Sequence, residues 1–187
     1  MSNEATGAQI ARPSGADAGS LGYLALGLTL LAYGLLSTGI LSGTGAKDAA
    51  TLAHLVGGLT LFIAGLWQFR SGEGFTGTAF TSLGAFWAVW SGAGGAGKNA
   101  TGLFLLLWTL LALTLAAAGW NSGLFSRAVY GLLALSLALS AIGVFAGSGG
   151  LGKFAGWVAA VSGLVAWYSA TAALTNSGWG RAVLPVR

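Results

Sequence analysis

Six long stretches of the chain contain no Asp, Glu, Lys or Arg and consist mostly of apolar residues. They cover residues 21–41, 49–69, 75–90, 100–118, 128–146 and 154–174. A helix needs about 20 apolar residues to cross a hydrocarbon core of about 30 Å. Strands of a membrane barrel would instead alternate between apolar and polar positions. The pattern therefore predicts an all-α membrane protein, a bundle of six transmembrane helices with both termini on the same side.

The segments outside these runs are short and carry the charges. Residues 1–19 are predicted to form a flexible N-terminal tail, residues 20–176 the six-helix domain, and residues 177–187 a short C-terminal tail. The connections between the runs are too short to hold a further domain. Any function must therefore lie within the bundle.

Basic residues are unequally shared between the two ends of the predicted bundle. Cytoplasmic loops of membrane proteins carry an excess of Lys and Arg. We therefore expect both termini in the cytoplasm and the protein in the cytoplasmic (plasma) membrane. The arginines on the side of the termini are Arg12, Arg70, Arg127, Arg181 and Arg187, and the lysines opposite are Lys47, Lys98 and Lys153.

The composition removes most classes of function. The chain has 8 Lys or Arg, 4 Asp or Glu, 1 His and no Cys, so only 6% of its residues are charged, against about 25% in a soluble domain. Scattered basic residues form no patch for a nucleic acid. No cluster of His or carboxylates suits a metal, and no serine lies in a G-x-S-x-G motif. We therefore expect no enzyme, no catalytic residue, no metal, no cofactor and no nucleic-acid partner.

A few polar side chains lie within the runs. Hydroxyl groups can replace part of the hydration shell of a small anion without a fixed charge that would trap it. They can equally bond back to their own helix. His54 is an ionisable group in the second run, which makes it a candidate proton relay as well as a neutral imidazole with a local partner. The hydroxyl candidates for a substrate path are Thr29, Thr78, Thr81 and Ser82.

Tryptophans fall into two groups. Trp87 lies within a run, where its indole N–H needs a partner, so it is a candidate for the path as well as for simple core packing. Tryptophans at the ends of runs are expected to anchor the helices at the headgroup level. These anchors are Trp67, Trp90, Trp120 and Trp179.

Small residues recur at helical spacing. Membrane helices associate through close packing of such residues, so the stripes predict helix contact faces, within the chain or between protomers of a ring. The stripes are Gly58 and Gly65 in the second run, Gly131, Ala134 and Ala138 in the fifth, and Ala155, Ala159 and Gly163 in the sixth.

Two blocks of motifs occur in order along the chain. The second run ends with Ala-Gly-Leu-x-x-aromatic-basic at 64–70, and the third contains TAFTS and GxFW. FAGW opens the sixth run, and G-R-x-V-L-P follows it. In these blocks the chain resembles the acetate uptake transporter family, over most of residues 20–187. The family's Asn-Pro-x-Pro at the start of the first helix is replaced here by Asp17, Ala18, Gly19 and Ser20.

The resemblance implies a channel or transporter for acetate and other short-chain carboxylic acids, succinate included, with a pore through each protomer of a homohexamer. It places the pore constriction at Leu26, Leu83 and Leu133. Ala166 occupies a position associated with pore width in the family. Family members usually have an aromatic residue, a Tyr and a Leu at the constriction, so an all-aliphatic ring favours an uncharged acid or one with a partial water shell.

Two other interpretations fit the same residues. Loss of the polar ring in the pore would leave a non-transporting structural or sensory membrane protein, and a related protein would conduct ammonium. For an acid, both routes remain open: passage as the neutral molecule, or passage as the anion along hydroxyl and backbone N–H groups.

Overall fold

The computed structural model describes residues 18–41, 43, 46–90, 92 and 96–185, and in these ranges all regular secondary structure is helical. Because α2, η1 and α3 follow one another without a gap, each of the six apolar runs corresponds to one helical rod. The all-α class is thereby confirmed for the described residues. The helices are α1 (Ala18–Thr38), α2 (Ala46–Ala53), η1 (His54–Thr60), α3 (Leu61–Arg70), α4 (Gly74–Trp90), α5 (Lys98–Ala118), α6 (Leu124–Ala146) and α7 (Gly149–Trp179).

The rods differ in length. Within the described residues, α1, α5, α6 and α7 are long and apolar enough to cross a membrane. Helix α4 has 17 residues, which at 1.5 Å per residue comes to about 26 Å. The second rod is divided by η1, a π-helix of 7 residues. Helix α7 is the longest, with 31 residues.

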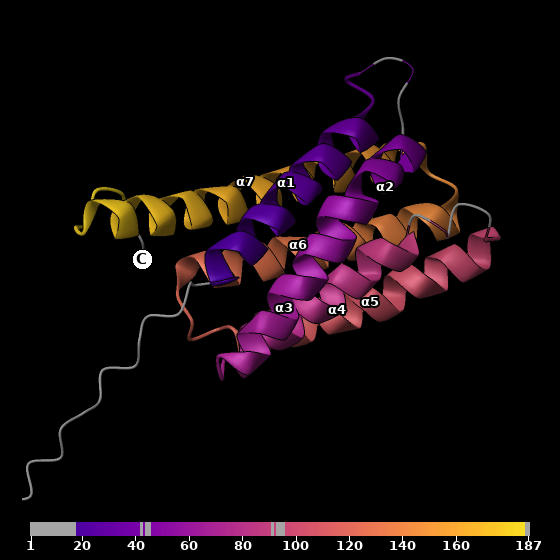
Figure 1. Cartoon of the computed structure of the whole chain (residues 1–187). Coiled ribbons are helices and arrows are strands. Elements are labelled where there is room, and N and C mark those ends of the chain that lie inside the picture. Colours follow the sequence, from indigo (N-terminus) through magenta and orange to yellow (C-terminus); the bar gives the residue numbers. More distant parts are fainter. Residues whose placement is uncertain (1–17, 42, 44–45, 91, 93–95, 186–187) are drawn as a thin grey trace, which may run out of the picture.

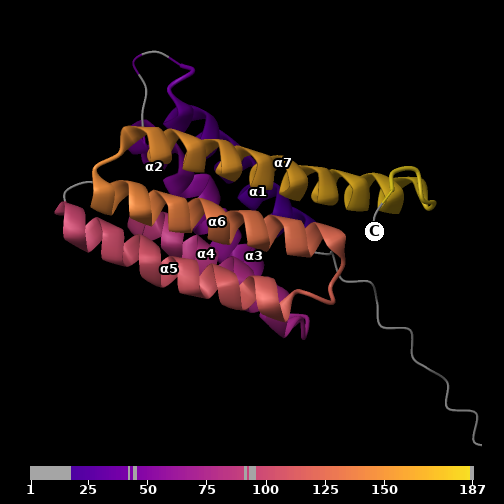
Figure 2. The same ribbon diagram turned by 180° about the vertical axis from the view of Figure 1, so that it is seen from behind.

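The rods lie side by side and run alternately in opposite directions (Figure 1). The start of α1 and the end of α7 therefore lie at the same end of the bundle, which we call the tail end. The opposite end, where α6 turns into α7, is called the far end; the view from behind in Figure 2 shows the same arrangement. Helices α1, α4 and α6 all run from the tail end to the far end.

Helix α1 packs backbone to backbone against α7 through two pairs of glycines. A Cβ atom added at Gly34 would lie 2.5 Å from the carbonyl oxygen of Gly156, and one at Gly27 would lie 2.9 Å from that of Gly163. The two pairs are seven residues apart along each helix, so their glycines occupy one face of each helix. This contact sets the antiparallel register of α1 and α7.

The second rod packs against α4 in the same manner. A Cβ atom at Gly84 would lie 2.6 Å from the backbone nitrogen of Phe62, and one at Gly65 would meet Thr81. The predicted small-residue stripe of the second run thus serves packing within the chain. Gly131 of α6 is different: it is exposed, and a Cβ atom there would have nothing within 4 Å.

The predicted domain limits lie near the start of the first helix, α1, and the end of the last helix, α7. Helix α1 begins at Ala18, and residues 1–17, with Arg12, lie outside the described residues. Helix α7 continues to Trp179, past the predicted limit at 176. Its Asn176 accepts hydrogen bonds from the backbone N–H groups of Val183 (2.7 Å) and Leu184 (2.8 Å), so the chain after α7 folds back along the helix.

Three of the four expected anchor tryptophans are exposed, namely Trp67, Trp120 and Trp179. Trp90 has a different environment. Its ring is half-buried and stacks on Phe86, with ring centroids 5.7 Å apart and an interplanar angle of 15°. It belongs to the aromatic packing between α4 and α5.

Candidate functional site

Helices α1 and α6 meet through side chains rather than through close backbone packing, which α1 makes with α7. Near the tail end, the Tyr130 hydroxyl donates to the Tyr23 hydroxyl at 3.4 Å. Near the far end, the Tyr33 hydroxyl lies beside Ser140. Both pairs are 107 positions apart in the sequence. Because the offset is the same at both ends, the two helices run in parallel and in register.

Helices α1 and α4 also run in parallel. The rings of Tyr23 and Phe80 are in edge contact with centroids 5.1 Å apart, and the ring of Tyr33 is in edge contact with those of Trp87 at 5.3 Å and Trp90 at 6.5 Å. The members of these pairs are 54 to 57 positions apart. A residue of α1 therefore lies level with the turn of α4 that follows 54 to 57 positions later.

The three sequence-predicted constriction residues occupy one level of the bundle. The offset of 107 places Leu133 of α6 at the level of Leu26, and the offsets of 54 to 57 place the turn of α4 that contains Leu83 at the same level. All three side chains are buried, with exposures of 0%, 3% and 1% respectively. The glycine contacts between α1 and α7 bring Ala166, which is also buried, to the same level. Leu26, Leu83, Leu133 and Ala166 are therefore buried apolar side chains at one level, contributed by α1, α4, α6 and α7. That this leucine layer is a pore constriction stays a prediction.

Hydroxyl groups flank this layer on both sides. The stripe of α1 that faces α6 follows spacings of three and four residues, which keep side chains on one helical face; the matching stripe of α6 follows the same rule. Leucines fill the middle of both stripes, and hydroxyl groups stand at their ends. The α1 stripe is Tyr23, Leu26, Leu30, Tyr33 and Ser37, and the α6 stripe is Ser126, Tyr130, Leu133, Leu137 and Ser140.

We call Tyr23, Ser126 and Tyr130 the tail-end cluster. The Tyr23 hydroxyl is 3.4 Å from Ser126 Oγ and 3.4 Å from the Tyr130 hydroxyl. The ring of Tyr130, which is fully buried, lies edge-on to Phe75 with centroids 5.6 Å apart. Rings of α4 thus hold both tyrosines of this cluster in place.

We call Tyr33, Ser37 and Ser140 the far-end cluster. Both serines lie beside the Tyr33 hydroxyl, yet Ser37 Oγ is buried without a hydrogen bond of ordinary geometry. An internal cavity of about 10 Å³ adjoins the cluster, close to the volume that one water centre needs. The cavity is lined by Leu30, Tyr33, Phe86, Trp87, Leu133, Ser136, Leu137, Ser140 and Ala159.

Thr29 of α1 packs against η1, the π-helical part of the second rod. Its Oγ1 is buried and has no hydrogen-bond partner. A Cβ atom at Gly57 of η1 would come within 2.9 Å of that oxygen and 3.0 Å of Trp87 Cγ. Thr29, Gly57 and Trp87 are therefore in contact, and the sequence-predicted path residues Thr29 and Trp87 are brought together. Single-turn π-helical distortions are frequent at functional sites.

The hydroxyls that the sequence predicted on α4 have different environments. Thr81 Oγ1 is buried without a partner and faces Gly65. The exposed Thr78 donates to the carbonyl oxygen of Gly74 at 2.8 Å, and Ser82 donates to that of Thr78 at 2.6 Å. Such bonds to the helix's own carbonyls occupy the hydroxyl hydrogens. Thr78 and Ser82 thus hydrogen-bond within α4 and lie apart from the α1 and α6 stripes.

The model of the GPR1/FUN34/yaaH family matches residues 3–94 and 92–186, which is nearly the whole chain. The chain belongs to this family. It is 29% identical over 180 residues to the succinate-acetate/proton symporter SatP of Escherichia coli K12, covering 91% of this chain and 95% of the relative. It is 32% identical over 138 residues to the ammonia transport outward protein 2 of Saccharomyces cerevisiae, covering 66% of this chain and 49% of the relative.

The fold of this chain also resembles that of a solved structure. The structure of the bacterial acetate channel SatP superposes with a TM-score of 0.83 at 28% sequence identity, covering 92% of this chain and 99% of that chain. The chain therefore shares its helical arrangement with a bacterial acetate channel.

Several residues of the enclosed stripes in this family member were not predicted from the sequence. Tyr23, Tyr33 and Tyr130 count as apolar residues in a hydropathy pattern, and Ser126 and Ser140 are lone hydroxyls. The spacing of three and four residues is the signal that could have found them, because it places each on the same helical face as a constriction leucine.

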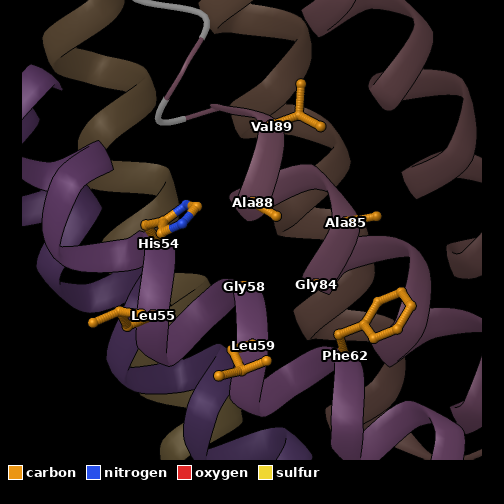
Figure 3. Close-up of a pocket in the computed structure, with 9 residues that line it drawn as sticks. All are labelled: His54, Leu55, Gly58, Leu59, Phe62, Gly84, Ala85, Ala88 and Val89. Atoms are coloured by element: carbon orange, nitrogen blue, oxygen red, sulfur yellow. The ribbon is translucent and has the colours of Figure 1, made fainter.

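His54 lies outside the enclosed layer. It lines a groove of about 440 Å³ between the second rod and α4, together with apolar side chains such as Leu55 and Leu59 (Figure 3). Both leucines are exposed, so the groove opens toward the surroundings of the bundle. In this family member the only histidine therefore lies on the outer face.

Proposed function

We propose that this chain carries acetate and similar short-chain carboxylic acids across the cytoplasmic membrane, along a path enclosed by α1, α4, α6 and α7. The observation that carries the proposal is the leucine layer between two hydroxyl clusters. A carboxyl group finds hydrogen-bond donors on both sides of a narrow dry segment. Kinship with a succinate-acetate/proton symporter and the fold of an acetate channel support the choice of substrate.

The dry layer favours the protonated acid. An isolated carboxylate loses its hydration at a large cost in free energy when it enters an apolar medium, whereas a neutral carboxyl group pays only the cost of a polar group. Leu26, Leu83 and Leu133 present no donor to offset that cost. Transport of the neutral acid moves a proton with each acetate, and it needs no ionisable relay in the path.

Six membrane crossings with cytoplasmic termini fit this path. The second rod and α4 lie beside the four longer rods, and arginines such as Arg70, Arg127 and Arg181 lie at the tail end. An excess of basic residues favours the cytoplasmic side. We therefore assign the tail end to the cytoplasm.

The path belongs to each protomer, and we propose that protomers assemble into a ring, hexameric as the family resemblance implies. Apolar side chains along α5 are exposed, as is Gly131 of α6. Small exposed residues allow close approach of helices in lipid. Native mass spectrometry in mild detergent should show a single closed oligomer; monomers alone would contradict the ring.

Uptake of isotope-labelled acetate into liposomes that contain the purified protein tests the transport function. We expect uptake above that of empty liposomes, increased when the external pH is lower than the internal pH. No uptake under either pH gradient would favour a structural or sensory membrane protein instead. Uptake of labelled methylammonium without uptake of acetate would favour ammonium conduction.

A further inference from the structure

We propose that η1 is a gate of the path: residues 54–60 change between π-helical and α-helical winding, and this change moves Trp87, which borders the leucine layer. The inference rests on the proposed transport function and specifies which part of the chain moves. The winding of η1, its contact with Trp87 and the groove on its outer side each support a moving segment.

The hydrogen bonding of η1 departs from that of the helix that follows it. In an α-helix each backbone N–H donates to the carbonyl oxygen four residues earlier, and in a π-helix to the one five residues earlier. Residues 54–60 are π-helical, whereas the N–H of Leu61 donates to the carbonyl oxygen of Gly58, only three residues earlier. The spacing of the bonds therefore changes next to Gly57 and Gly58. Glycine has the widest backbone freedom, so this pair allows the second rod to exchange one winding for the other.

Gly57 brings η1 into contact with the interior of the bundle. A Cβ atom at Gly57 would lie 2.6 Å from Thr29 Cγ2 and 3.0 Å from Trp87 Cγ. Thr29 Oγ1 is buried without a hydrogen-bond partner, and a buried hydroxyl in that state costs free energy. A second winding that presents a carbonyl oxygen of η1 to this hydroxyl recovers that cost. The environment of Thr29 therefore favours a second state of η1.

Trp87 links η1 to the proposed path. Its side chain is buried and lies in the wall of the internal cavity of about 10 Å³, together with Leu30 and Leu133. Its ring is in edge contact with that of Tyr33, with centroids 5.3 Å apart. Close-packed interiors transmit a displacement from one side chain to the next. A shift of Gly57 therefore moves Trp87 and changes the width of the path next to Leu133.

The outer side of η1 leaves room for such a shift. The groove of about 440 Å³ lies between the second rod and α4, and the exposed Leu55 and Leu59 of η1 line it (Figure 3). Nearer the tail end the second rod is in tight contact with α4, since a Cβ atom at Gly65 would lie 2.9 Å from Thr81 Cα. Helix α3 therefore stays fixed on α4 while η1 changes its winding.

A reversible cross-link between η1 and α4 tests the gate. A Cβ atom at Gly58 would lie 3.5 Å from that of Ala88, and disulfides join Cβ atoms about 3.5–4.5 Å apart. The Gly58→Cys, Ala88→Cys double variant should therefore form a disulfide in this otherwise cysteine-free chain. We expect the oxidised variant to take up labelled acetate into liposomes about tenfold more slowly than the same variant after reduction. Equally fast uptake in both forms, with cross-linking complete, would overturn the gate.

The Gly143→Cys, Leu151→Cys variant is the matched control, because it joins α6 to α7 and leaves η1 free to move. A Cβ atom at Gly143 would lie 3.3 Å from that of Leu151, so a small adjustment permits the disulfide. Oxidation of this variant should leave acetate uptake unchanged. If oxidation slows uptake in the control as much as in the Gly58, Ala88 variant, the effect does not belong to η1 and the gate is refuted.

A second readout needs neither transport nor a variant. Hydrogen–deuterium exchange with mass spectrometry compares the backbone amides of η1 with those of α5 in the purified wild-type protein. We expect η1 to exchange about tenfold faster or more, because a segment that changes its winding opens its hydrogen bonds. Fast exchange in η1 without any acetate uptake would refute the transport function and support the moving segment. Normal uptake with exchange in η1 as slow as in α5 would refute the gate alone.

Discussion

Leu26 of α1 and Leu133 of α6 are buried at one level of the bundle, between the Tyr23–Tyr130 contact on one side and the Tyr33–Ser140 contact on the other. The hydroxyl contacts on the two sides both join residues that are 107 positions apart, and the same offset separates Leu26 from Leu133. This arrangement turns three leucines that are far apart in the sequence into one layer with polar borders. Selectivity in the proposed path then depends on the width and dryness of this layer.

A smaller side chain in the layer should relax size exclusion. We expect Leu133→Ala to raise uptake of lactate and succinate relative to acetate, because the substitution removes three heavy atoms from the path and no polar contact. Competitive uptake of the three acids in one liposome preparation measures this ratio. An unchanged order of preference in a folded Leu133→Ala protein would mean that Leu133 does not set the width.

The same substitution should cost little stability if Leu133 borders a path. Leu105 of α5 is equally buried but lies outside the layer. Leu105→Ala should lower the free energy of unfolding by about 2–5 kcal/mol, as in a packed core, and Leu133→Ala by less. Thermal denaturation of both variants in detergent makes the comparison.

A hydroxyl restored to the layer should favour acetate. Leu83→Tyr narrows the path and adds a donor at the level of Leu26, so acetate should gain relative to acetamide, a neutral solute of similar size. The ratio of acetate to acetamide uptake is the measurement. A lower ratio than in wild type would contradict a path at this position.

The glycine contact between α1 and α7 should tolerate no side chain. In Gly34→Ala the new Cβ atom meets backbone atoms of α7 at 2.5 Å, so we expect a loss of about 1–3 kcal/mol in stability. Gly131→Ala is the matched control, since nothing lies within 4 Å of its Cβ position and Ala favours a helix more than Gly. Equal melting temperatures of the two variants would argue against the α1–α7 register.

The orientation can be measured with single cysteines, because the chain has none of its own. Glu73 lies in the turn between α3 and α4 at the tail end, and Gly97 precedes α5 at the far end; both are exposed. An impermeant maleimide on intact cells should label Gly97→Cys and spare Glu73→Cys. The reverse pattern would place the tail end outside the cell.

Hydropathy predicted the number and position of the helical rods because charged residues are confined to the ends of the rods and the connections between them. It did not predict the π-helix around Gly57, since hydropathy contains no information about which backbone groups pair. It also did not predict that Trp90, at the end of a run, stacks on Phe86 and Phe104.

The resemblance to a known family selected Leu26, Leu83 and Leu133 for the candidate site. All three side chains are buried, and their role as a constriction stays a prediction. The hydroxyl clusters were missed because each combines residues more than 100 positions apart, such as Tyr23 and Tyr130. Only the tertiary register of α1 and α6 shows that their hydroxyls converge.

The most direct test of an enclosed path uses a thiol placed in the leucine layer. Leu26→Cys in this cysteine-free chain should support acetate uptake that methyl methanethiosulfonate blocks, and excess acetate should slow the modification. Leu113→Cys on the exposed face of α5 is the control, and its uptake should be unaffected by the reagent. Unchanged acetate uptake after complete modification of Leu26→Cys would contradict a path through this layer.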